Sequence, residues 1–274
     1  MTFGQAVTKV STAASLSIIL TACGVESDSI HSNLDVTNGI EISEETYASV
    51  VLLVSVTEEG QSICTATFVN DQQVVTAGHC VYDLDPNEPS LYYVHLNEQG
   101  EGEYSVKAKS FAINPDYDMT VNNGVNPQDL AVVTFPEDTA PAVSQISFKT
   151  PAVGSELTIV GYGNNRNYME ENGKLSGSGA GTKRVGDNIL RANSSGFLSF
   201  YGLPEANGVV EAGEQSASAS GDSGGPMIVG NRLVGVTSGG GLSQGSGDSL
   251  IKVSHYVDLN SPESRRFLSS ALVK

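Results

Sequence analysis

The sequence predicts an all-β protein of antiparallel strands with one short helix near the C-terminus. Short runs of β-branched and aromatic residues recur along the chain, separated by Gly, Asn, Asp or Pro, as in strands joined by turns. Glycine accounts for 30 of the 274 residues and tryptophan is absent, a composition that favours a turn-rich β protein over a helical bundle. Sandwiches or barrels are therefore the expected architectures.

Local patterns predict the individual elements. The runs expected to form strands are, in order, 47–55, 64–70, 90–96, 104–113, 130–135, 156–162, 189–200 and 226–238. Within the last run, Gly230-Asn231 predicts a tight hairpin turn. Ser261 and Pro262 suit the N-cap and the first position of a helix, whereas the Gly- and Ser-rich stretch 173–186 predicts a mobile surface loop.

The charge balance argues against one class of partner. With 14 basic and 31 acidic residues, the net charge is -17, which disfavours any role that depends on neutralising phosphates. Nucleic acid is therefore not an expected partner. No stretch has the ligand spacing of a calcium loop, so we predict neither a metal nor a cofactor.

The N-terminal segment resembles an export signal. Residues 1–22 contain one charge, Lys9, and an apolar run too short to span a bilayer. The run ends in Leu-Thr-Ala before Cys23 and resembles the lipobox of bacterial lipoproteins, in which the cysteine carries the lipid; an ordinary signal peptide is the alternative. Residues 23–35 are polar and predict a tether or propeptide. We expect an exported, membrane-anchored lipoprotein, periplasmic or on the cell surface, which proteolysis could release.

The cysteine count predicts a disulfide. Of the three cysteines, Cys23 is assigned to the lipid, which leaves Cys64 and Cys80 in an exported, disulfide-permissive setting. We expect these two to be bridged. A loop of this length contributes about 3 kcal/mol of stability in the chain-entropy account.

Two motifs carry the predicted chemistry. Thr-Ala-Gly-His-Cys contains His79, and Gly-Asp-Ser-Gly-Gly-Pro contains Ser223. A serine hydroxyl becomes a nucleophile when an imidazole takes its proton, and the imidazole needs a carboxylate to fix its tautomer. Asp129, at the start of the apolar run Leu130–Val133, is the best candidate for the carboxylate. The other candidates are Asp116, Asp118 and Glu137.

These motifs, in this order, resemble the chymotrypsin/trypsin family of serine proteases over about residues 36–260. The resemblance implies two six-stranded antiparallel barrels, at about 36–145 and 146–260, and a C-terminal helix at about 261–272, within a domain 36–274. It also implies that a protein or peptide substrate is cleaved through an acyl-enzyme in the cleft between the barrels. By this resemblance His79 is the general base, Asp129 its orienting group and Ser223 the nucleophile, and the amides of Gly221 and Ser223 bind the oxyanion.

The resemblance also implies an activation step. In the family a freshly cut apolar N-terminus pairs with the aspartate before the nucleophile, which is Asp222 here, and Val36 is the matching start. Asp35 precedes Val36, where a trypsin-like activator would require arginine or lysine. The hypothesis is that cleavage before Val36 activates the enzyme and frees it from its lipid.

The substrate pocket is less well defined than the triad. The position that carries an aspartate in trypsin is Ala217, Ser238 and Gly240 match the pocket wall, and Asp248 matches a second floor position. Two specificities stay open: a basic residue bound by Asp248, or a small or medium apolar residue. A catalytically silent, protease-like binding module is the alternative function. An esterase is disfavoured because the motif around Ser223 is Gly-Asp-Ser-Gly-Gly and not the strand-turn-helix Gly-x-Ser-x-Gly pattern. We expect a monomer.

Overall fold

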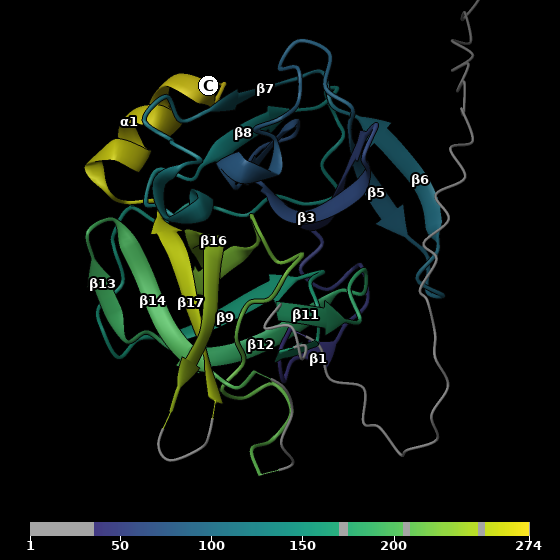
Figure 1. The fold of residues 1–274 in the computed structure, drawn as a ribbon. Helices are drawn as coiled ribbons and strands as arrows, with labels where there is room; N and C mark the ends of the chain where they lie inside the picture. The colour runs from purple at the N-terminus through teal and green to yellow at the C-terminus, as the bar shows by residue number, and fades with distance from the viewer. Residues whose placement is uncertain (1–35, 170–174, 205–208, 246–249, 274) are drawn as a thin grey trace, which may run out of the picture. The chain divides into compact units, whose positions relative to one another are not determined.

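Two antiparallel sheets contain nearly all strands of the part of the chain that the structure describes (Figure 1). The structure is a computed structural model, and it describes residues 36–169, 175–204, 209–245 and 250–273. These residues all belong to the unit Ser32–Lys274. The expected signal (1–22), the tether (23–35) with Cys23, and Asp248 lie outside the described residues.

The first sheet has seven strands and a core of aromatic and aliphatic side chains. Its strands, in spatial order, are β6 (Gly102–Lys107), β5 (Leu91–Leu96), β2 (Val50–Thr57), β3 (Gly60–Phe68), β4 (Gln73–Thr76), β8 (Ala131–Thr134) and β7 (Ser110–Ile113). Phe68 packs against Tyr93 and Phe135, with ring centroids 5.8 Å apart in each pair. Such rings bury large apolar areas, which fixes the inner face of this sheet.

The second sheet has eight strands. In spatial order they are β1 (Ile40–Glu41), β12 (Arg184–Ile189), β9 (Glu156–Gly161), β15 (Pro226–Val229), β16 (Arg232–Gln244), β17 (Leu250–Asp258), β14 (Phe197–Gly202) and β13 (Ala192–Ser194). A separate pair joins β10 (Arg166–Met169) to β11 (Leu175–Ser178). The hairpin predicted at Gly230-Asn231 is confirmed, since both residues have positive φ, 56° and 61°, as a type I′ turn requires.

The all-β class and the C-terminal helix are confirmed, whereas the strand count differs from six per barrel. The run 104–113 is divided into β6 and β7, and the run 189–200 contains a turn at Ser195-Gly196, where φ is 53° and 78°. A backbone with positive φ leaves the β region, so one apolar run becomes two short strands. The two-residue β1 adds a further strand to the edge of the second sheet.

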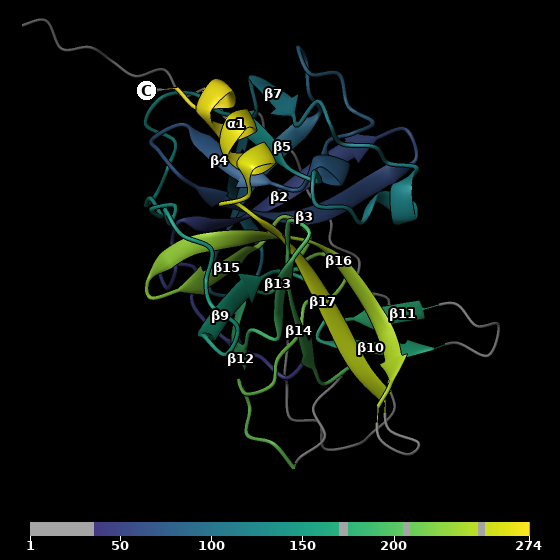
Figure 2. The same cartoon turned by 90° about the vertical axis from the view of Figure 1, so that its left-hand side faces the viewer.

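Helix α1 (Pro262–Ala271) begins as its sequence predicts. The Ser261 hydroxyl accepts the backbone N–H of Ser264 at 3.1 Å, and Pro262 stands at the first helical position. Phe267 and Leu268 are buried in a cluster with Val75 and Val132 of the first sheet, Leu233 and Val236 of the second, and Leu130 before β8. Figures 1 and 2 show the helix beside the first sheet, near β7. The helix therefore covers the apolar contact at which the two sheets meet.

The stretch 173–186 is not the surface loop that its composition predicts. In the described part it contains β11 and the beginning of β12, and Lys183 and Arg184 are buried, with 1% and 3% exposure. The Lys183 ammonium donates to the carbonyls of Glu44 and Tyr47, both at 3.0 Å. Buried cations need such partners, and these contacts join residues far apart in the sequence.

None of the helices in the described ranges has the length and apolar character needed to cross a membrane.

Candidate active site

His79 and Asp129 come from the ends of two paired strands. The short 3-10 helix η1 (Gly78–Cys80) follows β4, and Asp129 stands just before β8. Strands β4 and β8 are hydrogen-bonded neighbours, with Thr76 opposite Ala131. Because the pair is antiparallel, the end of β4 lies beside the start of β8. Both residues therefore follow or precede neighbouring strands at the same end of the first sheet.

The carboxylate of Asp129 is inaccessible to solvent and holds the histidine at two points. Its Oδ2 lies 2.8 Å from His79 Nδ1, and its Oδ1 accepts the backbone N–H of His79 at 2.9 Å. The Ser238 hydroxyl donates to Oδ2 at 2.6 Å. A carboxylate at Nδ1 favours the tautomer with a proton there and leaves Nε2 as an acceptor. The His79 ring is 23% exposed, so Nε2 can face a substrate.

The other candidate carboxylates do not share this position. Asp116, Asp118 and Glu137 are all exposed. The Asp118 side chain accepts the backbone N–H and the hydroxyl of Thr120, at 2.8 and 2.7 Å. Of the four candidate carboxylates, Asp129 is the one that contacts the His79 ring.

Ser223 lines the same cavity as His79. This cavity has a volume of about 540 Å³, and the Cys64–Cys80 disulfide forms part of its wall. Three carboxylates also face it, Glu58, Glu59 and Asp83. The structure thus gathers the serine, the histidine and, behind it, the buried aspartate at one cleft.

The backbone beside Ser223 offers two free donors. Gly221 has φ 99°, in a region that glycine enters without steric cost. Among the described residues, the N–H groups of Gly221 and Ser223 donate to no protein acceptor. Two such N–H groups next to a nucleophile form an anion-binding position.

Asp222 is buried beneath this turn. Its two carboxylate oxygens accept the N–H groups of Gly163 and Ala219, each at 2.8 Å. Burial raises the pKa of the Asp222 carboxyl from its ordinary value of 3.8 to about 6, opposed by the hydrogen bonds and by the positive charges of Arg184 and Lys252.

The segment that begins at Val36 lies next to Ala217, one of the predicted pocket residues. Val36 is fully buried, and Thr37 exchanges backbone hydrogen bonds with Ala217 at 3.1 and 3.3 Å. The Ser216 hydroxyl donates to the carbonyl of Asn38 at 3.1 Å. Val36 belongs to the same buried apolar cluster as Ala217.

Of the predicted pocket residues, Ser238 and Gly240 lie on β16, whereas Ala217 lies outside the strands and bridges to Thr37. Two further residues, Ser218 and Ser254, are linked to them. Gly240 in β16 is opposite Ser254 in β17. The Ser254 hydroxyl accepts from the Ser218 hydroxyl and from the Ser218 backbone N–H, both at 3.0 Å. Ser218 follows Ala217, which is fully buried. Ser254 could not be identified from the sequence, because it stands in no recognisable motif and its partner Ser218 is 36 residues away.

The predicted disulfide between Cys64 and Cys80 is confirmed, with Cα atoms 6.3 Å apart. It links β3 to η1, the element that carries His79. The sulfur atoms of both cysteines and a ring nitrogen of His79 lie within 4.8 Å of one another, a spacing that would suit a metal ion. Since the two sulfurs are bonded to each other, neither is the thiolate that a metal needs.

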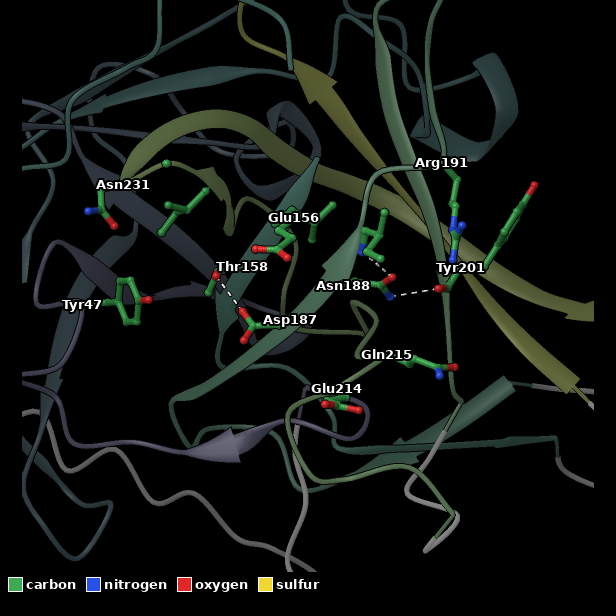
Figure 3. Close-up of a pocket in the computed structure, with 14 residues that line it drawn as sticks. Tyr47, Glu156, Thr158, Asp187, Asn188, Arg191, Tyr201, Glu214, Gln215 and Asn231 are labelled. Atoms are coloured by element: carbon green, nitrogen blue, oxygen red, sulfur yellow. Dashed lines mark hydrogen bonds between the residues drawn. The ribbon is translucent and has the colours of Figure 1, made fainter. Parts of the chain in front are cut away.

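A larger cavity of about 750 Å³ lies elsewhere, against β9 and β12 (Figure 3). It contains none of the predicted site residues. Several of its polar side chains are already paired, since Thr158 donates to Asp187 at 2.6 Å and Asn188 donates to the Tyr201 carbonyl at 2.9 Å. The candidate site is therefore the smaller cleft.

Two antiparallel sheets that bring a serine, a histidine and a buried aspartate to one cleft define the class of chymotrypsin-like serine hydrolases. The family model described as Trypsin matches residues 39–259. The chain thus belongs to the trypsin family of serine proteases.

Relatives in animals and bacteria agree with this assignment. Trypsin 5G1 of Aedes aegypti is 27% identical over 223 residues, which cover 78% of this chain and 78% of that protein. Serine protease 1 of Homo sapiens is 30% identical over 217 residues, or 72% of this chain and 78% of that protein. Trypsin of Saccharopolyspora erythraea is 28% identical over 192 residues, covering 68% and 78%.

Proposed function

We propose that this protein is an exported serine endopeptidase that cleaves peptide bonds through an acyl-enzyme. The observation that carries the proposal is the 2.8 Å contact between His79 Nδ1 and Asp129 Oδ2, at a cavity that Ser223 also lines. Membership in a protease family supports the same reaction.

In the proposed mechanism, Ser223 Oγ attacks the carbonyl carbon of the scissile bond while its proton passes to His79 Nε2. Asp129 stabilises the resulting imidazolium and does not itself take the proton. The negative charge that develops on the substrate oxygen lies between the N–H groups of Gly221 and Ser223, and each such donor is worth about 3 kcal/mol in this kind of site. His79 then gives its proton to the leaving amine.

The second half of the reaction repeats these steps with water. His79 removes a proton from a water molecule, the hydroxyl attacks the acyl carbon, and Ser223 leaves with the proton that His79 returns. The peptide's new carboxyl end is released. No group beyond these side chains and water is required.

The substrate side chain before the cleaved bond is proposed to enter the pocket bounded by Ala217, Ser238 and Gly240, with the Ser254 hydroxyl at its floor. The Ser254 hydroxyl is uncharged, and the buried Lys252 on the same face of β17 is itself basic, so a basic preference would depend on Asp248. Comparing arginyl, alanyl and phenylalanyl peptides tests this. A loss of arginyl cleavage in Asp248→Ala supports the basic preference, and equal arginyl cleavage in both proteins overturns it.

Activation and anchoring are parts of the same proposal. Cleavage before Val36 is proposed to create an ammonium that pairs with Asp222, and Cys23 is proposed to carry the lipid. Mass spectrometry of active material should find a start at Val36. Full activity of a chain still carrying residues 23–35 excludes obligatory cleavage, and an unmodified Cys23 in the exported precursor excludes the anchor.

Labelling with a fluorophosphonate tests the central claim. The reagent should modify Ser223 in the wild type, whereas Ser223→Ala should show neither labelling nor peptide cleavage. Glu263→Gln, which changes a carboxylate in the first turn of α1, serves as the control and should be labelled normally. If the wild type is folded but neither labelled nor active, the protein is a silent binding module instead.

A further inference from the structure

One buried threonine contacts the turn that carries the nucleophile. Thr65 lies in β3, directly after Cys64, and is fully buried. Its hydroxyl donates to the Gly221 carbonyl at 2.9 Å and accepts the backbone N–H of Tyr162 at 3.1 Å. A hydroxyl has one hydrogen, so the contact with Tyr162, which can only donate, directs that hydrogen to Gly221.

The backbone of Thr65 adds two further contacts. Its N–H donates to the Ser223 carbonyl at 2.8 Å, and its own carbonyl accepts the Thr76 hydroxyl at 2.9 Å. A Cβ added at Gly224 would lie 2.3 Å from the Thr65 carbonyl oxygen. The turn is therefore packed directly onto this one residue of the first sheet.

These contacts matter because peptide units are planar. The Gly221 N–H shares its plane with the Ser220 carbonyl, which accepts from Asn164 at 2.8 Å. The Ser223 N–H shares its plane with the Asp222 carbonyl, which accepts from Gly225 at 2.8 Å. Each plane that presents an oxyanion donor is thus held by a backbone bond.

The plane between these two contains the Gly221 carbonyl and the Asp222 N–H. It sets the angle between the two donors, because rotating it turns one donor plane relative to the other. Its N–H donates to the Ala219 carbonyl at 3.0 Å, and its carbonyl is held by the Thr65 hydroxyl. Thr65 is thus the side chain of the first sheet that fixes this plane.

We propose that Thr65 is a positioning residue of the oxyanion hole, whose hydroxyl holds the Gly221 carbonyl so that the N–H groups of Gly221 and Ser223 converge on one point. This inference rests on the proposed protease function. It adds that the geometry of the second sheet's catalytic turn is set from the first sheet, across the cleft.

A matched pair of substitutions tests the proposal. Thr65→Val keeps the shape and removes the hydroxyl. Thr67→Val makes the same change two residues along β3, at a fully buried threonine whose hydroxyl has no hydrogen-bond partner in the described chain. Thr65→Ser keeps the hydroxyl and removes a methyl group.

We expect Thr65→Val to lower kcat about 10- to 100-fold with little change in KM, because a donor misaligned in the transition state weakens a charge-assisted bond. Its affinity for a peptide boronate should fall by a similar factor. Thr65→Ser should stay within about threefold of the wild type, and Thr67→Val should match the wild type. Should Thr65→Val fail to fold, Thr65→Ala against Thr67→Ala gives the same comparison.

Three results would overturn the proposal: an unchanged kcat and boronate affinity in Thr65→Val, an equal loss in Thr65→Ser, or an equal loss in Thr67→Val. Urea unfolding of each variant separates lost activity from lost folding. Failure of the protease function itself would look different, because the wild type would then show no fluorophosphonate labelling at all.

Discussion

Asp129 holds His79 by the ring and by the backbone at the same time, with one carboxylate oxygen at 2.8 Å from Nδ1 and the other at 2.9 Å from the peptide nitrogen. The ring therefore cannot rotate away without breaking a contact in a fully buried environment. A Cβ at Gly78 would lie 3.2 Å from the same carboxylate, which accounts for the small residue before the histidine.

Asp129→Asn should abolish most activity while leaving the fold intact. The amide can donate to Nδ1, which selects the tautomer with its proton on Nε2 and removes the acceptor that Ser223 needs. We expect kcat to fall about 10⁴-fold, the loss known for this change in this family. Circular dichroism and peptide hydrolysis check the result; a loss below about tenfold would show that Asp129 does not orient the histidine.

Asp222 should make stability depend on pH. Burial raises the pKa of its carboxyl to about 6 in the folded protein, whereas in the unfolded chain the pKa has its ordinary value of 3.8. Between these values the folded state holds a proton that the unfolded state has lost, so this contribution is complete below about pH 4 and is lost as pH rises through 6. Compared with Asp222→Asn, the wild type should lose about 3 kcal/mol of unfolding free energy over this range.

Urea unfolding of both proteins in the uncut form, in which no new ammonium pairs with Asp222, measures this difference at pH 3.5, 5 and 7. The comparison with Asp222→Asn cancels the titration of the other carboxylates. A difference between the two proteins that stays constant with pH contradicts the prediction.

The disulfide should contribute to stability as its loop length suggests. Cys64 and Cys80 are 16 residues apart, which corresponds to about 3 kcal/mol. The double variant Cys64→Ala, Cys80→Ala should unfold at correspondingly lower urea. Added reductant should destabilise the wild type by a similar amount and leave the double variant unchanged; equal sensitivity of both would refute the assignment.

Gly163→Ala should disrupt the nucleophile turn. An added Cβ would lie 2.6 Å from the backbone nitrogen of Asp222, too close for any real contact, so backbone must move. We expect a cost above about 2 kcal/mol and a large loss of fluorophosphonate labelling. Gly241→Ala, where a Cβ meets nothing within 4 Å, is the control and should behave as the wild type.

Features that depend on short motifs or on the alternation of apolar and polar residues could be predicted from the sequence. His79, Asp129 and Ser223 stand in recognisable local patterns, and the hairpin at Gly230 follows from two adjacent residues. Thr65 could not be found in this way, because its partners Tyr162 and Gly221 are 97 and 156 residues away.

The loop prediction for residues 173–186 was wrong because Gly and Ser content does not show which side chains are buried. Carbonyl groups of Glu44 and Tyr47, far away in the sequence, accept the Lys183 ammonium. Whether a cation is buried depends on partners that composition does not identify.

The Cys64–Cys80 bond beside His79 has a consequence for where the molecule acquires activity. Under the proposed export, the chain is made in a compartment that keeps thiols reduced and moves to one that permits disulfides. Before translocation it would lack the bond that holds Cys80, the residue next to His79. We expect the hydrolytic machinery to mature only after translocation, which would spare the producing cell's own proteins. Expression in strains with reducing and oxidising cytosol, without the leader, would reveal this as a difference in specific activity.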